Sequence, residues 1–415
     1  MNTMKRVVIT GMGTVNPLGN NVEDFWKAIK AAENGIGKLT RFEANGYTSK
    51  VAGEVKGFIP EKVLEAKEAR RMDRFTQFAM VSSLEAMRDA KLAVGDTDPE
   101  RFGIILGNGI GGIETLEAQC RRIFEKGPQS VHPLLVPMMI ANEAPGNVAI
   151  RLKAFGPCRC VVTACASSND ALGDAWRLIR EDSADVMLAG GTEAPLTGLG
   201  YSGFCSLQAV STRNDEPDKA SRPFDRDRDG FIMAEGAGVL VLEELEHAKK
   251  RGARILAEMV GYGATCDANH LTAPHPEGRG AIKAMTIALD SAGLAPEDID
   301  YVNAHGTSTP INDPIETRVI KAVFGERAKK LKVSSTKSMT GHLLGAAGGV
   351  EAIVTVKAIL DQFFPPTRNL DNPDPECDLD YVPHKGYTGR IRAAMSNALG
   401  FGGHNAIVVF QEYRE

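Results

Sequence analysis

Three reactive side chains in this sequence, each flanked by very small residues, form a set suited to acyl-thioester chemistry. Cys165 stands between two alanines, His305 precedes a glycine, and His342 follows one. A thiolate attacks thioesters, and an imidazole can move a proton or donate a hydrogen bond to a developing negative charge. Each of the three follows a short apolar run, so the elements around them must decide whether they meet.

Cys165 is predicted to lie at the start of a helix. It follows the apolar run 160–163 and precedes a helix-like pattern over 168–180. At a helix N-terminus the macrodipole and unpaired N–H groups would lower the pKa of the thiol, and the same N–H groups can hold a thioester oxyanion. The alternative interpretation is a buried structural cysteine on a tight strand–helix turn.

The two histidines have different neighbours. His305 precedes the hydroxyl-rich stretch 306–309, which suits an extended polar ligand but could equally satisfy a loop backbone around a core histidine. His342 follows Lys337 and precedes a glycine-rich helix pattern containing Glu351. Each glycine there costs a helix about 1 kcal/mol relative to alanine, which favours close packing against another backbone. Lys337 and Glu351 are either an ordinary ion pair or the charges that orient His342.

Near the C-terminus, the segment 397–405 places a single bulky ring, Phe401, among glycines. A mobile loop with an aromatic gate is the functional interpretation. A turn with a core-packed phenylalanine is the alternative.

The elements that must position these residues alternate between short apolar runs and longer helix-like patterns. This alternation indicates an α/β fold with largely buried strands. The predicted strands are residues 7–10, 102–106, 160–163, 186–189, 238–242, 301–304, 331–335 and 406–410.

A weak internal repeat is also visible. The helix pattern 86–92 leads through a proline-containing turn into run 102–106, and the pattern 288–294 leads in the same way into run 301–304. Runs 160–163 and 331–335 are each followed by a reactive residue and a Gly/Ala-rich helix. We therefore expect two similar halves, meeting near residue 255, that bring their reactive residues to a shared central cleft.

The bulk properties exclude several classes of protein. The chain has 415 residues, which exceeds the usual size of one domain, and its net charge of −5 argues against nucleic-acid binding. Seven scattered cysteines without a C-x-x-C pair favour free thiols over disulfides or zinc. The sequence has no apolar run of about 18 residues and no signal-peptide core near its start, so we expect a cytoplasmic protein without membrane insertion.

Two motifs invite wrong assignments. Residues 107–112 fit G-x-G-x-x-G, but prolines follow the next helix instead of a strand ending in an acidic residue, so a pocket-lining turn is favoured over dinucleotide binding. Residues 225–230 resemble an EF-hand start, yet the twelfth position is Gly236 and arginines are interleaved, which favours a salt-bridged turn. The eight histidines show no metal spacing, and we expect no catalytic metal.

Taken together, the motifs around Cys165, His305 and 337–342 closely resemble those of the β-ketoacyl-acyl carrier protein synthases, the condensing enzymes of fatty-acid synthesis, and most of all the type II elongating members. The resemblance extends from 8–13 to 400–403. It implies a thiolase-like duplicated fold in five layers, α-β-α-β-α, with halves at 1–255 and 256–415, and a homodimer. It also implies no bound cofactor, because acyl carrier protein brings its own phosphopantetheine.

The resemblance further implies a role for each site residue. Cys165 would accept the acyl chain, with its own N–H and that of Phe401 as the oxyanion hole. His305 and His342 would assist decarboxylation of malonyl-acyl carrier protein and stabilise the enolate that then attacks the acyl-cysteine. The supporting set is Lys337 and Glu351 as charges, Thr307 and Thr309 at the phosphopantetheine arm, Phe401 as gate, Ile110 and Phe204 at the acyl pocket, and Lys67, Arg70, Arg71 and Arg74 for docking of the acidic carrier protein.

Some alternatives stay open. A polyketide-type ketosynthase would share these residues, whereas a thiolase would carry a second cysteine in the C-terminal glycine loop, and 402–404 contains none. A non-catalytic partner subunit would lack Cys165. The sequence leaves open the preferred acyl length, the full docking footprint and a monovalent cation near Asn303, Ser396 and Asn397.

Overall fold

The computed structural model describes residues 4–415 of the protein. Its main sheet has ten strands, which include all eight of the predicted runs. Each predicted run coincides or overlaps with a strand, and two further strands, β8 and β13, appear in the second half. The strands are β1 (Val7–Val15), β4 (Phe102–Gly107), β5 (Cys158–Val161), β6 (Val186–Glu193), β7 (Gly236–Glu244), β8 (Ala257–Cys266), β9 (Ile299–Asn303), β10 (Lys332–Ser334), β13 (Ala393–Gly400) and β14 (His404–Gln411).

The strand order proves the internal repeat. The ladder runs β10-β9-β13-β14-β8-β1-β7-β6-β4-β5, so each half orders its own five strands first-fifth-fourth-second-third. The directions match as well: in both halves the first, fifth and fourth strands pair antiparallel, and the fourth, second and third pair parallel. Within residues 4–415, the ladder passes from one half to the other where β1 pairs with β8 over three residue pairs. The boundary that we place at residue 255 lies between α9 (Leu245–Lys250) and β8.

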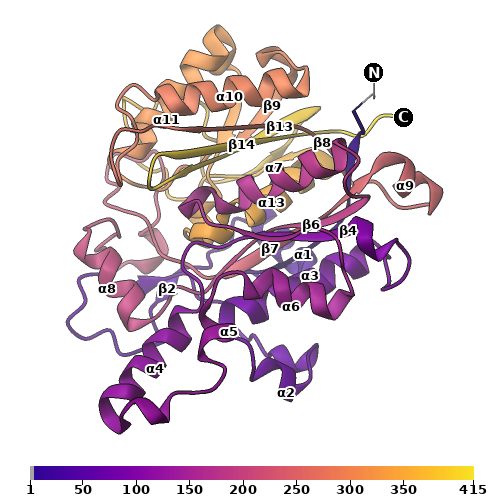
Figure 1. Ribbon diagram of the computed structural model, residues 1–415. Coiled ribbons are helices and arrows are strands. Elements are labelled where there is room, and N and C mark those ends of the chain that lie inside the picture. The colour runs from indigo at the N-terminus through magenta and orange to yellow at the C-terminus, as the bar shows by residue number, and fades with distance from the viewer. Residues whose placement is uncertain (1–3) are drawn as a thin grey trace.

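The helices complete five layers (Figure 1). Helices α7 (Ser167–Arg180) and α13 (Ala347–Asp361) lie between the two sheets and contact strands of both. Helices α3 (Arg74–Asp89) and α6 (Glu143–Leu152) cover the outer face of the first sheet, and α10 (Arg279–Ala292) and α11 (Asn312–Phe324) cover that of the second. The predicted α-β-α-β-α thiolase-like architecture is confirmed.

Close packing of the two inner helices explains the glycines that open α13. A Cβ on Gly348 would lie 2.3 Å from Oδ1 of Asn169 on α7, and one on Gly349 would lie 2.3 Å from the carbonyl oxygen of Gly238 on β7. The missing side chains therefore let α13 approach both the other inner helix and the first sheet, as the sequence predicts. The reactive residues that precede α7 and α13 are thereby brought to one place.

The remaining helices lie at the periphery. Helices α4 (Ile113–Lys126), α5 (Leu135–Met139) and α8 (Gly198–Ser206) project from the lower left of the molecule in Figure 1. In the turn at 225–230, Asp225 pairs with Arg222 and Arg228 pairs with Asp374, so the salt-bridged interpretation is confirmed. Within residues 4–415, no helix is both long and apolar enough to span a membrane.

Candidate functional site

The nucleophile candidate sits on a strained turn at the centre of the molecule. After β5 the chain adopts a left-handed conformation at Ala164, with φ +51°, and makes one 3-10 turn that contains Cys165 before α7 begins. The hydroxyl of Ser167 donates to the carbonyl oxygen of Ala164 at 2.6 Å and accepts from the N–H of Thr163 at 2.9 Å, which fixes the turn. Strain of this kind persists only where the surrounding structure enforces it.

The same turn recurs in the second half, before α13. Leu344 has φ +50° and begins the equivalent 3-10 turn, and His342 lies just before it. The sulfur of Cys165 and Nε2 of His342 are 3.0 Å apart. Because Nδ1 of His342 accepts the N–H of Leu344 at 3.3 Å, Nε2 carries the proton in the neutral ring and points it at the sulfur.

His305 completes the trio from the end of β9. Its ring centroid lies 5.3 Å from that of His342, with the two planes at 86°. Its loop is held by Glu316 of α11, which accepts the N–H groups of His305 at 2.7 Å and Gly306 at 2.8 Å. Nδ1 of His305 is buried without a hydrogen-bond partner in the described residues. The three predicted residues therefore meet, and Glu316 is a support that the sequence analysis missed.

Burial controls the charges of the trio. Burial, with the positive charge of Lys337 as the next cause, holds the pKa of His305 and of His342 well below the usual histidine value. Both rings are therefore neutral at neutral pH. The expected lowering of the thiol pKa is wrong for this site: burial raises the pKa of Cys165 to about 12 and outweighs the lowering by Lys337 and by the backbone N–H of Phe401. The thiol is thus protonated at rest.

Lys337 and Glu351 form an ion pair in the interior beneath the trio. Their side chains are 2% and 4% exposed, and Nζ of Lys337 donates to Oε1 of Glu351. Burial raises the pKa of Glu351, while Lys337 opposes that rise. Lys337 also acts on the titration of all three reactive groups. The ion pair is thus present and its charge acts on the trio, while a role in orienting His342 stays a prediction.

Several buried oxygens near this pair have no hydrogen-bond partner among the described residues. They belong to the side chains of Asn303, Ser396, Asn397 and Glu351. Asn303 and Ser396 are register partners on β9 and β13. Uncharged and carboxylate oxygens are the donors that hard cations prefer, so these residues fit the monovalent cation that the sequence leaves open.

A pocket of about 320 Å³ leads from the surface to the trio. Phe401, Phe204, Thr307 and Thr309 line it, and their roles as gate, acyl-pocket wall and phosphopantetheine contacts stay predictions. The two threonine hydroxyls are 3.0 Å apart, and the rings of Phe204 and Phe401 have centroids 6.4 Å apart. Ile110 is not among the lining residues; it is 36% exposed, and its part in an acyl pocket stays a prediction.

The predicted docking cluster divides into two parts. Lys67, Arg70 and Arg71 are exposed around α2 (Ala66–Ala69). Arg74 differs: its guanidinium makes two hydrogen bonds, at 2.7 and 2.8 Å, to the buried carboxylate of Glu235, so it is turned inward and is corrected from a docking residue to a structural one.

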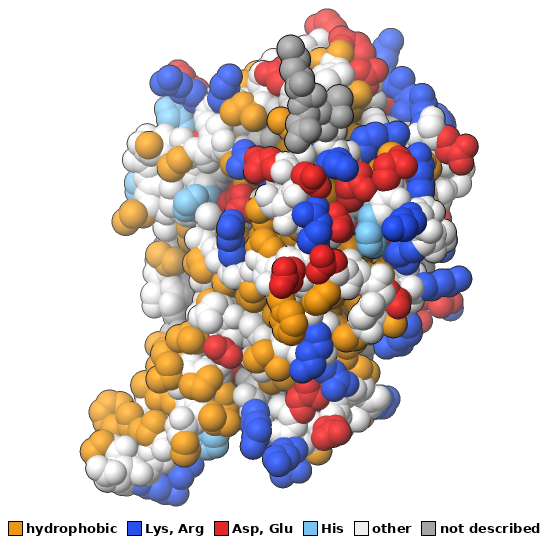
Figure 2. Space-filling view, turned by 45° about the vertical axis from the view of Figure 1, so that its right-hand side comes forward, with side chains coloured by type: hydrophobic (Ala, Val, Ile, Leu, Met, Phe, Trp, Pro, Cys, Tyr) orange, Lys and Arg blue, Asp and Glu red, His pale blue; other side chains and the backbone are white. Residues whose placement is uncertain are grey.

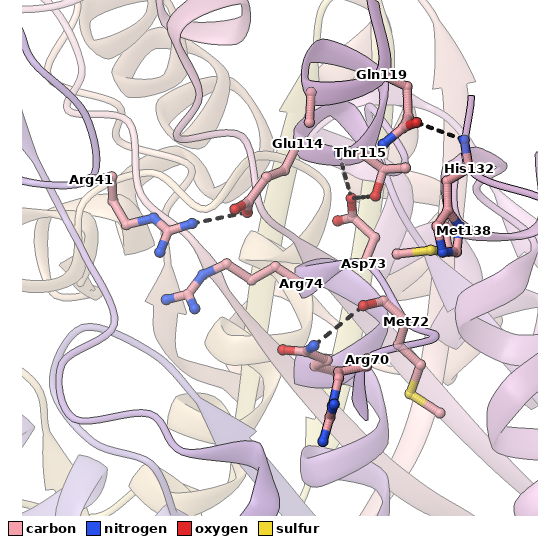
Figure 3. A pocket seen from close by; sticks show the side chains of 12 residues that line it. Arg41, Arg70, Met72, Asp73, Arg74, Glu114, Thr115, Gln119, His132 and Met138 are labelled. Carbon is pink, nitrogen blue, oxygen red and sulfur yellow. Dashed lines mark hydrogen bonds and ion pairs between the residues drawn. The ribbon is translucent and has the colours of Figure 1, made fainter. Parts of the chain in front are cut away.

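A separate pocket of about 390 Å³ opens between Arg70 and α4, well apart from the lining of the Cys165 pocket. Figure 3 shows it with Arg41 paired to Glu114 and Asp73 bonded to Thr115. Internal ion pairing satisfies most of its charges, which leaves Arg70 as the basic group on its edge.

The chain is similar over its whole length to proteins of known family. The model of the β-ketoacyl synthase N-terminal domain matches residues 4–248, and that of the β-ketoacyl synthase C-terminal domain matches residues 256–371. The chain is 53% identical to the 3-oxoacyl-[acyl-carrier-protein] synthase 2 of Synechocystis sp., covering 99% of both chains. It is 52% identical to the protein of that name from Staphylococcus aureus, over 100% of both.

Solved structures agree. A β-ketoacyl synthase from Burkholderia phymatum superimposes with a TM-score of 0.91 at 38% identity, over 99% of this chain and 100% of that one. A type II polyketide ketosynthase, solved with its acyl-carrier protein and a bound hexaketide, superimposes with a TM-score of 0.92 at 36% identity, with the same coverage.

Proposed function

This chain belongs to the β-ketoacyl synthase family, and from that membership we infer that it elongates acyl chains on acyl carrier protein by decarboxylative condensation with malonyl units. The observation that carries the reaction is the convergence of one thiol and two neutral imidazoles in one pocket, with His342 Nε2 at 3.0 Å from the sulfur of Cys165. The relatives named 3-oxoacyl-[acyl-carrier-protein] synthase 2 are 52–53% identical over the full length, whereas the polyketide ketosynthase is 36% identical, which favours fatty-acid elongation.

In the first step we propose that Cys165 receives the acyl chain. Its sulfur bonds to the thioester carbonyl carbon, the bond from that carbon to the phosphopantetheine sulfur breaks, and the thiol proton ends on the departing sulfur. The N–H groups of Cys165 and Phe401 would hold the oxyanion, a role supported by the place of both residues in one pocket lining and by the lowering effect of the Phe401 N–H on the thiol pKa. The raised thiol pKa keeps the resting site uncharged until a substrate arrives.

In the second step malonyl-acyl carrier protein loses CO₂ and its thioester becomes an enolate. His305 and His342 would donate hydrogen bonds to the enolate oxygen, and the protonated Nε2 of His342 supports this role. The enolate carbon then bonds to the acyl carbonyl carbon, and the cysteine thiolate leaves and takes up a proton. A thiolase would need a second cysteine here, and among the described residues lining the pocket Cys165 is the only one.

The remaining roles concern substrates and surroundings. Thr307 and Thr309 would contact the phosphopantetheine arm that the carrier protein brings, so the enzyme needs no cofactor of its own. Lys67, Arg70 and Arg71 would dock the carrier protein. A monovalent cation held by the side-chain oxygens of the cluster around Asn303 would offset the negative charge of Glu316 and Glu351 and so steady the His305 loop. All seven cysteines are free thiols, which supports a cytoplasmic location.

We also propose a homodimer formed along β5. This strand ends the sheet and is largely exposed, and α4 and α5 of the same half carry exposed apolar side chains, among them Phe124 at 89% and Val136 at 57%. Figure 2 shows hydrophobic side chains gathered on the projecting lower arm that these helices form in Figure 1. Exposed apolar patches and unpaired strand edges are both typical of interfaces. Light scattering should give twice the chain mass; a single-chain mass at micromolar concentration would contradict the dimer.

The test of the reaction is Cys165→Ala. The variant should form no acyl-enzyme and no β-ketoacyl product, while still releasing CO₂ from malonyl-acyl carrier protein, because decarboxylation is assigned to the histidines. Mass spectrometry of the carrier-bound products separates these activities. Chain elongation at the wild-type rate by Cys165→Ala would refute the mechanism.

A further inference from the structure

Glu193, at the end of β6, is a fully buried carboxylate that the mechanism above does not use. It is 0% exposed, and uncharged N–H groups supply its hydrogen bonds. Oε2 accepts the backbone N–H groups of Gly109 at 2.7 Å and Gly345 at 2.9 Å. Oε1 accepts the N–H of Ile110 and the side-chain amide of Asn108, each at 3.2 Å. Burying such a group is costly unless every hydrogen bond is made, so its retention calls for an explanation.

The partners of Glu193 come from two segments with separate tasks. Gly109 and Ile110 belong to the loop after β4, where Ile110 is the predicted wall of the acyl pocket. Gly345 belongs to the turn that begins α13, three residues after His342. The carboxylate thus ties the predicted acyl-pocket wall to the turn that carries one catalytic imidazole.

The internal repeat explains why a carboxylate fits there. Strands β6 and β13 are equivalent, and they end at Glu193 and Gly400. Cys165 and Gly345 are each the middle residue of the 3-10 turn before an inner helix. A Cβ on Gly400 would lie 3.2 Å from the backbone nitrogen of Cys165, so the glycine at this position keeps the space beside the Cys165 N–H open. At the counterpart turn, the Glu193 carboxylate fills the equivalent space beside the N–H of Gly345.

We propose that Glu193 is a positioning residue that occupies the non-catalytic counterpart of the oxyanion site and sets the acyl-pocket wall at Ile110 relative to His342. Duplication produces two turns with inward N–H groups; one receives the substrate oxyanion and the other receives an internal anion. The proposal rests on the proposed function, since it assigns the acyl pocket to the region of Ile110. It makes Glu193 a determinant of acyl-length selectivity.

An electrostatic effect accompanies this position. The negative charge of Glu193 is one of the causes that raise the pKa of Cys165 and of Cys160, after burial in each case. Burial raises the pKa of Glu193 itself to about 7, so the carboxylate is charged at pH 8. Replacing it with a neutral amide should therefore make the Cys165 thiol more acidic, which a merely structural role does not predict.

The experiment compares Glu193→Gln and Glu193→Asp with the wild-type enzyme. Gln removes the charge and points an amide N–H₂ at backbone donors, so the ratio of kcat/KM for eight-carbon and sixteen-carbon acyl-carrier protein should change by at least about fivefold. Alkylation of Cys165 by iodoacetamide at pH 8 should accelerate by at least about twofold. Asp keeps the charge but shortens the reach, so it should alter the length ratio while the alkylation rate stays within about twofold of wild type.

Glu85→Gln is the matched control. Glu85 is a half-buried carboxylate that accepts two backbone N–H groups, from Thr14 and Val22, and burial raises its pKa to about 7 as well. It lies on α3, away from the pocket lining, so its variant should keep the wild-type length ratio and alkylation rate. If both Glu193 variants kept the wild-type length ratio, the proposal would be overturned even if they were less stable. A wild-type enzyme without condensing activity would instead refute the proposed function. In that case alkylation still tests the proposal, and an unchanged alkylation rate of Glu193→Gln would overturn the link from Glu193 to Cys165.

Discussion

Replacing His342 with alanine tests whether the imidazole acts as a neutral hydrogen-bond donor. The N–H of Leu344 fixes the tautomer with the proton on Nε2, and burial keeps the ring uncharged at neutral pH. Removing one donor to a developing oxyanion costs about 2.7–4 kcal/mol, which corresponds to a roughly 10²- to 10³-fold slower step. We expect this loss in the decarboxylation of malonyl-acyl carrier protein. Glutamine at this position offers an amide N–H near Nε2 and should recover at least about tenfold of the loss.

The assay measures CO₂ release in the Cys165→Ala background, where acyl transfer does not contribute. Because His342 is 2% exposed, its removal leaves a cavity, and thermal unfolding must show that each variant is folded at the assay temperature. With both histidine pKa values well below the usual value, the rate should be flat from pH 6 to pH 8. A wild-type profile that titrates near the ordinary histidine pKa, or a His342→Ala rate within about fivefold of the parent, would refute the donor role.

Two further predictions concern buried and exposed charge. Lys337→Met leaves the Glu351 carboxylate buried without its cation, so urea unfolding should show a loss of about 3–5 kcal/mol in the free energy of unfolding. The double variant Lys337→Met/Glu351→Leu should recover most of this loss. A loss under about 1 kcal/mol in Lys337→Met would contradict the pairing. Arg70→Glu/Arg71→Glu should raise the KM for acyl-acyl carrier protein by about tenfold without altering turnover of acyl-pantetheine. Lys250→Glu, at an exposed position on α9, is the control. An equal rise in KM in the double variant and in Lys250→Glu would argue against a specific docking surface.

Most of the sheet could be predicted from apolar runs, but two strands, β8 and β13, could not. Strand β8 carries glycines where a strand pattern favours branched side chains. A Cβ on Gly261 would lie 2.3 Å from the carbonyl oxygen of Ala288, and one on Gly263 would lie 2.1 Å from that of Ala284, both on α10. The requirement for close helix–sheet packing therefore removes the very residues that indicate a strand. Strand β13, rich in alanine and polar residues, likewise lacks an apolar run.

The site was predictable where residue type and spacing carry the chemistry. It was not predictable where the role of a residue depends on a partner that the sequence pattern does not reveal. Cys165, His305 and His342 meet as expected because the repeat places equivalent turns at one centre. Arg74 could not be assigned correctly, since its partner Glu235 is 161 residues away in sequence. Glu316 was missed for a different reason: its partners are only 10 and 11 residues away, but a single acid in a helix pattern gives no hint that its carboxylate accepts the N–H groups of the preceding loop.

The thiol pKa was the most informative error, because its cause bears on the choice of reaction. A helix start lowers a thiol pKa only while the site remains polar, and here Cys165 is 8% exposed and burial prevails. The same burial keeps both imidazoles neutral and makes them weak bases, because an imidazolium formed by taking a proton from water would be buried as well. An acyl group on Cys165 then faces hydrogen-bond donors that stabilise an enolate, and bases too weak to deprotonate a hydrolytic water readily. Burial thus directs one shared set of residues toward carbon–carbon bond formation and away from hydrolysis.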